Sequence, residues 1–462
     1  MALVDAVRNV LAIGKEGTLR SHLLNIGHLL SGAAMSNGLA LVSVGLAART
    51  LTTEMFGIFV LILTAVRLIE RIMRFESWQP LIKFAAHIEG ASEKRKLSRL
   101  YLYGFLLDIA AATAAALVSV LLAALFTPLF GLKSGAVYLV AICAVGVLFN
   151  IGGAPTAALR LTGRFRTVAY NQLIGPVLRI PLAFFCWWYD LGITSFMICW
   201  TLAQVVGSLV FIYQGLVALR AQGIPNPFRQ SPRNLPADFP GFSSFGWSTN
   251  ISTTMRALTQ EADTLLVGSL AGASSAGFYH VAKRLAKLAQ QVGAQTQAVL
   301  YPEMARLWVD GKLAQLRQLT RRIQLVLATI GWSAVALSAL IGEWFVTVAI
   351  GDKYSSVGPI LVTQLIAVSF IMNAAPSRSV LLSMGKPHFV LVIATLGAAI
   401  FFGAGYLLIL EFGALGASMA QVLSAAFVAG CMEVTWARKL RHSLTAATGV
   451  DAPPPAAGQP AP

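Results

Sequence analysis

Charged side chains inside long apolar segments are the feature of this sequence that most directly suggests chemistry. A lipid-facing cation at the centre of a membrane helix costs about 2.5–3.5 kcal/mol, so such a residue must face water or a partner. Ten basic residues lie in these segments: Arg67, Arg71, Arg74, Lys83, Arg179, Arg256, Lys283, Arg284, Lys287 and Arg378. They are accompanied by seven acids: Glu70, Glu76, Asp108, Glu261, Asp263, Glu303 and Glu433. Because the acids are too few to neutralise the cations, we expect an aqueous cavity that binds an anion.

Several of the basic residues are spaced to share one face of a helix. Arg67, Arg71 and Arg74 lie at i, i+4 and i+7, and Trp78 continues the same stripe. A guanidinium group binds phosphate through two parallel hydrogen bonds and keeps its charge in a poorly hydrated site. We therefore predict a substrate-binding cavity for a phosphate group, formed by the following residues: Arg67, Arg71, Arg74, Arg179, Arg256, Lys283 and Lys287.

Two of the acids allow more than one interpretation. Glu70 lies inside the arginine stripe, at spacings from Arg67 and Arg74 that permit ion pairs within the helix. Glu70 and Asp263 are candidates for coupling transport to H⁺ or Na⁺, and they are equally candidates for counter-ions of the arginines. Both roles stay open at this point.

No pattern for catalysis or for a cofactor accompanies these residues. The sequence has no G-x-x-x-x-G-K-[ST] loop, no G-x-S-x-G and no H-E-x-x-H. The six histidines are scattered, and the four cysteines lie in apolar segments without a C-x-x-C pair. We therefore expect no enzyme activity, no resident metal and no cofactor.

The composition indicates which elements must position the charged side chains. Apolar residues make up 56% of the 462-residue chain and charged residues 12%, whereas about 25% of a soluble domain is charged. The mean hydropathy is +0.71. A helix crosses the bilayer in about 20 residues, and apolar segments of that length recur throughout. We predict an all-α polytopic membrane protein of about 12 transmembrane helices, at residues 22–47, 55–84, 100–126, 136–159, 165–189, 194–219, 243–269, 275–304, 322–343, 357–384, 388–410 and 414–437.

The basic residues between these segments predict the orientation. Apart from Arg49, Lys133 and Lys353, the Lys and Arg residues outside the predicted spans lie in alternate connections. Basic connections stay on the cytoplasmic side, so we predict a multi-pass protein of the inner membrane with both termini cytoplasmic. This distribution accounts for the net charge of +16 without a nucleic-acid partner.

A proline-rich segment divides the chain into two halves. Residues 220–242 contain five prolines and predict an extended cytoplasmic linker. The halves share short repeats, such as Ala203-Gln204-Val205 and Ala420-Gln421-Val422. We predict two pseudo-symmetric six-helix lobes around a central cavity. The predicted order is a cytoplasmic interfacial segment at 1–20, the N-lobe at 21–219, the linker at 220–242, the C-lobe at 243–440 and a disordered tail at 441–462.

Several short motifs resemble a known family. They are A-R-T-L-T-T-E-M-F-G-I-F at 48–59, A-D-T-L-L-V-G at 262–268, A-G-F-Y at 276–279 with K-R-L at 283–285, Y-P-E-M-A-R at 301–306 and G-A-L-G-A at 413–417. Their order is similar to that in polysaccharide-transport members of the multidrug/oligosaccharidyl-lipid/polysaccharide exporter superfamily. The resemblance implies a bacterial inner-membrane flippase that moves undecaprenyl-pyrophosphate-linked oligosaccharide units to the periplasmic leaflet by alternating access, for O-antigen or exopolysaccharide synthesis. It also implies polysaccharide polymerases and glycosyltransferases as partners.

Other functions fit parts of the sequence less well. A cation-coupled multidrug exporter of the same superfamily should have an acidic and aromatic cavity, and the predicted cavity is basic. A membrane-embedded glycosyltransferase or ligase usually has a large outer loop for its acceptor, and every predicted outer loop is short. A non-transporting scaffold does not explain the ten cations inside the spans.

Overall fold

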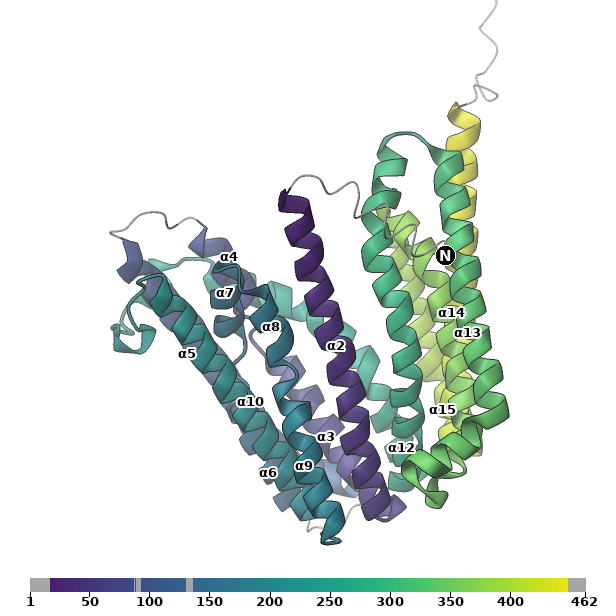
Figure 1. Cartoon of the computed structure of the whole chain (residues 1–462), viewed down its shortest axis with the longest axis horizontal. Helices are drawn as coiled ribbons and strands as arrows, with labels where there is room; N and C mark the ends of the chain where they lie inside the picture. Colours follow the sequence, from purple (N-terminus) through teal and green to yellow (C-terminus); the bar gives the residue numbers. More distant parts are fainter. Residues whose placement is uncertain (1–16, 87, 89–92, 130–135, 448–462) are drawn as a thin grey trace, which may run out of the picture. The chain divides into compact units, whose positions relative to one another are not determined.

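The structure is a computed structural model that describes residues 17–86, 88, 93–129 and 136–447; within its helices, the side chains of 17–30, 33, 124–129, 248, 249, 251–260, 292, 294–300, 302, 349 and 441–447 lie outside the description. These residues form helices and connections, without a strand among them (Figure 1). The helices are α2 (Gly17–Thr50), α3 (Thr53–Met73), α4 (Trp78–Ala85), α5 (Lys94–Leu129), α6 (Ala136–Leu148), α7 (Gly153–Leu161), α8 (Phe165–Asn171), α9 (Ile174–Trp188), α10 (Ile193–Ala221), η2 (Pro227–Arg229), α11 (Leu235–Asp238), α12 (Phe242–Val309), α13 (Leu313–Ile350), η3 (Asp352–Tyr354), α14 (Val357–Ser383) and α15 (Pro387–Ala447).

The prediction of an all-α polytopic fold is confirmed. Among the described residues, eight helical stretches are long and apolar enough to cross a membrane. One of them, Pro387–Leu440, has 54 residues and covers two of the predicted spans. The stretch α3 is not among the eight, and it carries Glu54, Glu70 and two arginines. The count of twelve spans stays a prediction.

Three of the predicted membrane segments of the first half are interrupted. The helix breaks lie between α3 and α4, between α6 and α7, and between α8 and α9. Each helix that follows a break has a proline at its third position: Pro80, Pro155 and Pro176. Proline fits the first turn because an N–H group there has no partner within the helix. The predicted single stripe from Arg67 to Trp78 is therefore wrong, since α3 ends at Met73 and Trp78 begins the next helix.

Two long helices bend at glycines that lie in predicted connections between spans. Gly272 in α12 has a φ of 83°, and Gly413 in α15 has a φ of 57°. Glycine adopts such left-handed backbone at little cost because it has no Cβ. Each bend separates two predicted spans, so the sequence boundaries near residues 270–274 and 411–413 correspond to real changes of direction.

The chain divides into two compact units. The first comprises residues 1–284 and 344–357, and the second comprises 285–343 and 358–462. In the first unit, α5 packs against α6, α10 packs against α6 and α9, and α2 packs against α8 and α9. In the second, apolar residues of α12, α13, α14 and α15 share one core that includes Met304, Leu316, Leu381 and Trp436. The predicted lobe boundaries at 219 and 243 stay a prediction.

The segment at 344–357 packs within the first unit although both its flanks belong to the second. Tyr354 is fully buried, and its ring contacts Phe56 at 5.8 Å and Phe278 at 5.6 Å between centroids, both edge-on. Arg49 donates a hydrogen bond to the Val348 carbonyl. The aromatic contacts thus hold this segment against α3 and α12, and the hydrogen bond from Arg49 holds it against α2.

The predicted C-terminal tail begins within a helix, and the predicted proline-rich linker contains short helices. Residues 1–16 of the predicted interfacial segment and 448–462 of the predicted tail lie outside the described residues. The helix α15 runs to Ala447, past the predicted start of the tail. The linker holds only the short helices η2 and α11, and Arg99 of α5 pairs with Asp238 at 2.6 Å.

Candidate functional site

The three helix breaks converge on one polar cavity in the first unit. Its volume is about 630 Å³, and residues at or next to each break line it, among them Arg74, Asn150 and Gln172. Non-helical backbone at membrane depth is tolerated only where it is buried in protein or lines a wet cavity. Interrupted helices form the binding sites of many transporters for this reason. We therefore take this cavity, hereafter the break cavity, as part of the candidate site.

A buried acid joins two of the breaks. The Oδ2 atom of Asp108 accepts hydrogen bonds from Ser77 Oγ at 2.8 Å and from the Ala154 N–H at 3.0 Å. Ser77 precedes α4 and Ala154 lies in the first turn of α7, where a negative charge is favourable. A Cβ at Gly153 would lie 2.2 Å from Ser77 Oγ and 2.6 Å from Asp108 Oδ2, so a larger residue here would displace this hydrogen-bonded pair. Asp108 thus fixes the shape of the break cavity.

Glu70 joins the same two breaks from the side of α3. Its carboxylate is buried and accepts hydrogen bonds from the Arg74 guanidinium and from Asn150 Nδ2. Arg74 follows the last residue of α3, and Asn150 lies between α6 and α7. Glu70 is therefore a counter-ion of Arg74 in this structure, and its role in ion coupling stays a prediction.

Three arginines of the first unit have no carboxylate partner among the described side chains. Arg67, Arg179 and Arg284, hereafter the arginine cluster, lie close enough for their charges to repel one another. Among the described side chains, none of the three has an oxygen of an acid within 4.0 Å, although the charge of Glu261 acts on Arg284 from farther away. The Nε atoms of Arg179 and Arg284 are buried, and no described group forms a hydrogen bond with them.

The arginine cluster is continuous with the break cavity through Arg179. This residue lies on α9, lines the break cavity, and its guanidinium carbon is 5.7 Å from the centre of the Trp200 ring. Arg67 and Trp200 line a second, smaller hollow of about 30 Å³, together with Gln204, which also lines the break cavity. A ligand that contacts Arg179 can therefore reach both regions.

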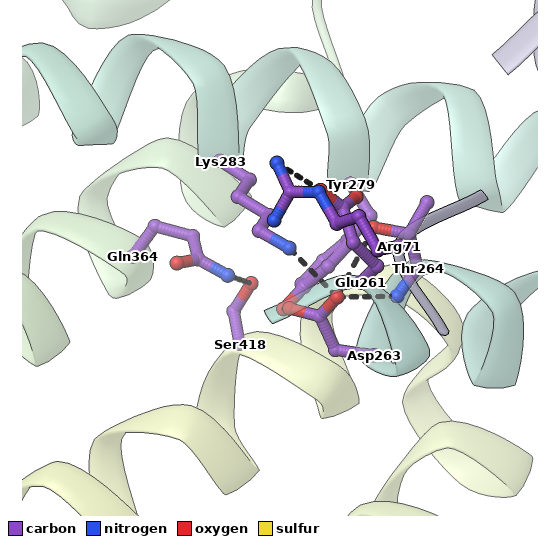
Figure 2. A network of polar contacts seen from close by, with 8 residues as sticks. All are labelled: Arg71, Glu261, Asp263, Thr264, Tyr279, Lys283, Gln364 and Ser418. Atoms are coloured by element: carbon purple, nitrogen blue, oxygen red, sulfur yellow. Dashed lines mark hydrogen bonds and ion pairs between the residues drawn. The ribbon is translucent and has the colours of Figure 1, made fainter. Parts of the chain in front are cut away.

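Other predicted site residues are held in ion pairs. Asp263 is buried, and its Oδ1 atom accepts from Lys283 Nζ at 2.7 Å while its Oδ2 atom accepts from the Tyr279 hydroxyl at 2.9 Å (Figure 2). The Thr264 N–H also donates to Oδ1, at 2.6 Å. Arg71 pairs with Glu261 at 3.8 Å. These contacts connect the two arms of α12 on either side of Gly272 and link α12 to α3.

The predicted site residues thus separate into groups. The structure brings Arg67 and Arg179 together, and it places Arg71, Arg74 and Lys283 beside acids. Lys287 is an exposed residue of α12 in the second unit, and the side chain of Arg256 lies outside the described residues.

Two cations that the predicted set omitted belong to the site. Arg284 completes the arginine cluster. Arg160 directly follows the predicted span at 136–159 and lines the break cavity, with its guanidinium carbon 4.2 Å from the centre of the Trp78 ring. In the described part of the chain, no group of three His, Cys, Asp or Glu side chains could hold a metal ion.

Comparisons with known proteins agree with this fold. A family model described as polysaccharide biosynthesis protein matches residues 46–359. The inner membrane protein YghQ of Escherichia coli (strain K12) is 24% identical over 339 residues, which cover 73% of this chain and 95% of YghQ. An inward-facing multidrug resistance MATE family transporter of the MOP superfamily has 14% identity and a TM-score of 0.71, over 90% of this chain and 96% of that one. The lipid II flippase MurJ, in an inward closed conformation, has 16% identity and a TM-score of 0.68, over 92% and 93%. The chain is therefore a multi-pass membrane protein with the transporter fold of these structures, and it belongs to the polysaccharide biosynthesis protein family.

Proposed function

We propose that this protein is a flippase for oligosaccharides linked to undecaprenyl pyrophosphate, and that the arginine cluster binds the pyrophosphate. The substrate would move from the cytoplasmic to the periplasmic leaflet by alternating access, for O-antigen or exopolysaccharide synthesis. The observation that carries the proposal is the set of three neighbouring guanidinium groups without a carboxylate partner among the described side chains.

The physical argument rests on charge in a poorly hydrated site. Like charges that repel one another in such a site destabilise the ligand-free protein, and a bound anion relieves that repulsion. A pyrophosphate offers several oxygens to the donor forks of Arg67, Arg179 and Arg284. Each hydrogen bond to a charged group contributes about 1.5–3 kcal/mol, so losing one arginine should weaken binding about 10- to 100-fold.

The likeness to a multidrug transporter suggests a second function, which the charges disfavour. A cationic drug would meet the positive charges of Arg67, Arg179 and Arg284. Like-charge contacts of this kind cost several kcal/mol at a binding surface. The arginine cluster thus favours an anionic substrate over a cationic one.

Transport in proteoliposomes tests the proposal. The purified protein would be reconstituted with undecaprenyl-pyrophosphate-linked oligosaccharide extracted from the cells that make it, and the appearance of glycan in the opposite leaflet would be measured with a membrane-impermeant glycosidase. We expect transport by the wild type and at least about 10-fold slower transport by Arg179→Gln and Arg284→Gln. Arg321→Gln is the matched control, because Arg321 is an exposed residue of α13. Equal rates for all four proteins, or uptake of an organic cation in place of the lipid, would overturn the proposal.

A further inference from the structure

The break cavity contains buried polar atoms that have no hydrogen-bond partner among the described side chains and backbone. They are the side-chain oxygen Oδ1 of Asn171 and the Nε atoms of Arg160 and Arg179, each buried without a hydrogen bond to any described group. All three residues line this cavity. A buried polar group without a partner costs about 1–3 kcal/mol, so a cavity lined by several such groups is suited to bind a polar ligand.

The charges that line the break cavity balance one another, because three acids, Glu70, Glu76 and Asp108, accompany three arginines, Arg74, Arg160 and Arg179. Glu70 is bound to Arg74, and Asp108 is bound to Ser77 and to the N-terminal turn of α7. The lining also contains amide and hydroxyl side chains, which offer both hydrogen-bond donors and acceptors. They are Asn171, Gln172, Gln204, Thr156 and Ser208. Such a mixture suits a ligand rich in hydroxyl and amide groups better than a second polyanion.

Aromatic and apolar groups complete the lining. Trp78 and Phe211 line the same cavity, and Arg160 packs over the Trp78 ring at 4.2 Å. Small-molecule sites typically combine aromatic walls with a few placed polar groups in about 300–1,000 Å³, and the break cavity has about 630 Å³. A sugar matches this surface because its ring has apolar C–H faces and hydroxyl groups at its edge.

The position of Arg179 indicates which part of the glycan would lie in the break cavity. Arg179 belongs both to the arginine cluster and to the lining of the break cavity. A pyrophosphate at the arginine cluster would place the sugar that is attached to it next to Arg179. We propose that the break cavity binds the glycan residues nearest the pyrophosphate, with Asn171 and Arg160 as their main polar contacts. This inference rests on the proposed function and adds a glycan-recognition site within the first unit.

Binding of two lipid probes to the full-length protein tests the inference. One probe is the undecaprenyl-pyrophosphate-linked oligosaccharide from the cells that make the protein, and the other is bare undecaprenyl pyrophosphate. We expect the wild type to bind the glycan-bearing probe at least about 10-fold more tightly. Asn171→Leu and Arg160→Leu should remove most of that difference and leave the affinity for the bare lipid unchanged. Gln315→Leu, at an exposed position of α13, should behave as the wild type.

The outcomes separate the two proposals. Equal affinity of the wild type for both probes would overturn the glycan site and leave the pyrophosphate site intact. Loss of affinity for both probes in Asn171→Leu and Arg160→Leu would also overturn it, because the residues would then act on the whole fold or on the pyrophosphate. If the wild type bound neither probe, the proposed function itself would fail.

Discussion

The ion pair between Asp263 and Lys283 makes a strong prediction about Lys283→Met. Asp263 is 4% exposed, and Lys283 is the residue that brings a positive charge to its carboxylate, at 2.7 Å (Figure 2). Removing one partner of a buried pair leaves the other charge uncompensated and costs about 3–5 kcal/mol. The hydrogen bonds from Tyr279 and the Thr264 N–H remain in the variant, so we expect a loss near the lower end, about 3 kcal/mol.

A double-mutant cycle measures this interaction. Asp263→Asn alone should also destabilise, since it leaves the Lys283 ammonium without its carboxylate. The double variant Asp263→Asn with Lys283→Met has no buried charge at either position, so its loss should be clearly smaller than the sum of the single losses. Equilibrium unfolding in mixed micelles gives the free energies. Additive losses, with a coupling energy near zero, would refute the reasoning.

Transport by the double variant then distinguishes two roles for Lys283. If Lys283 serves to neutralise Asp263, the double variant should transport at close to the wild-type rate. If Lys283 instead contacts substrate, as predicted from the sequence, or if Asp263 carries a coupling ion, the double variant should be stable and inactive. Stability and transport therefore have to be measured on the same preparations.

Three further substitutions test the packing around the site. Gly57→Ala should destabilise by about 1–3 kcal/mol in thermal unfolding, because its Cβ would lie 1.9 Å from the Ala273 carbonyl oxygen, and a variant as stable as the wild type would contradict this close approach. Tyr354→Phe should be neutral or stabilise by up to about 1–2 kcal/mol in the same assay, because its buried hydroxyl has no hydrogen-bond partner in the described part of the chain, and a clear loss of stability would contradict this. Glu70→Gln should destabilise by about 1–3 kcal/mol in equilibrium unfolding, because Arg74 loses its counter-ion, and Glu76→Gln is the control that should cost less.

The sequence predicted the helical class and most segment boundaries because apolar runs and glycine bends are local signals. Residues near 270–274 and 411–413 were expected between spans, and Gly272 and Gly413 bend α12 and α15 there. The helix breaks of the first half were not predicted, although a signal was present. Pro80, Pro155 and Pro176 each interrupt an apolar segment, and such interruptions point to a transporter's binding site.

The pairing of the charges could not be predicted, because it depends on contacts between distant residues. Arg71 meets Glu261, and Lys283 meets Asp263 across the bend at Gly272. The predicted site set included Lys283 and Lys287 and omitted Arg284, which is next to Lys283 in the sequence. Spacing within one helix shows which cations share a face. It does not show which of them will pair with an acid from another segment.

The affinity of the protein for lipids that differ only in their phosphate groups tests the arginine cluster most directly. Undecaprenyl pyrophosphate, undecaprenyl phosphate and undecaprenol would be titrated against the wild type and Arg179→Gln, with native mass spectrometry as the readout. We expect the wild type to prefer the pyrophosphate over undecaprenol by at least about 10-fold, and Arg179→Gln to lose most of that preference. Equal affinity of the wild type for all three lipids would contradict the assignment of Arg67, Arg179 and Arg284 as the site that binds the pyrophosphate.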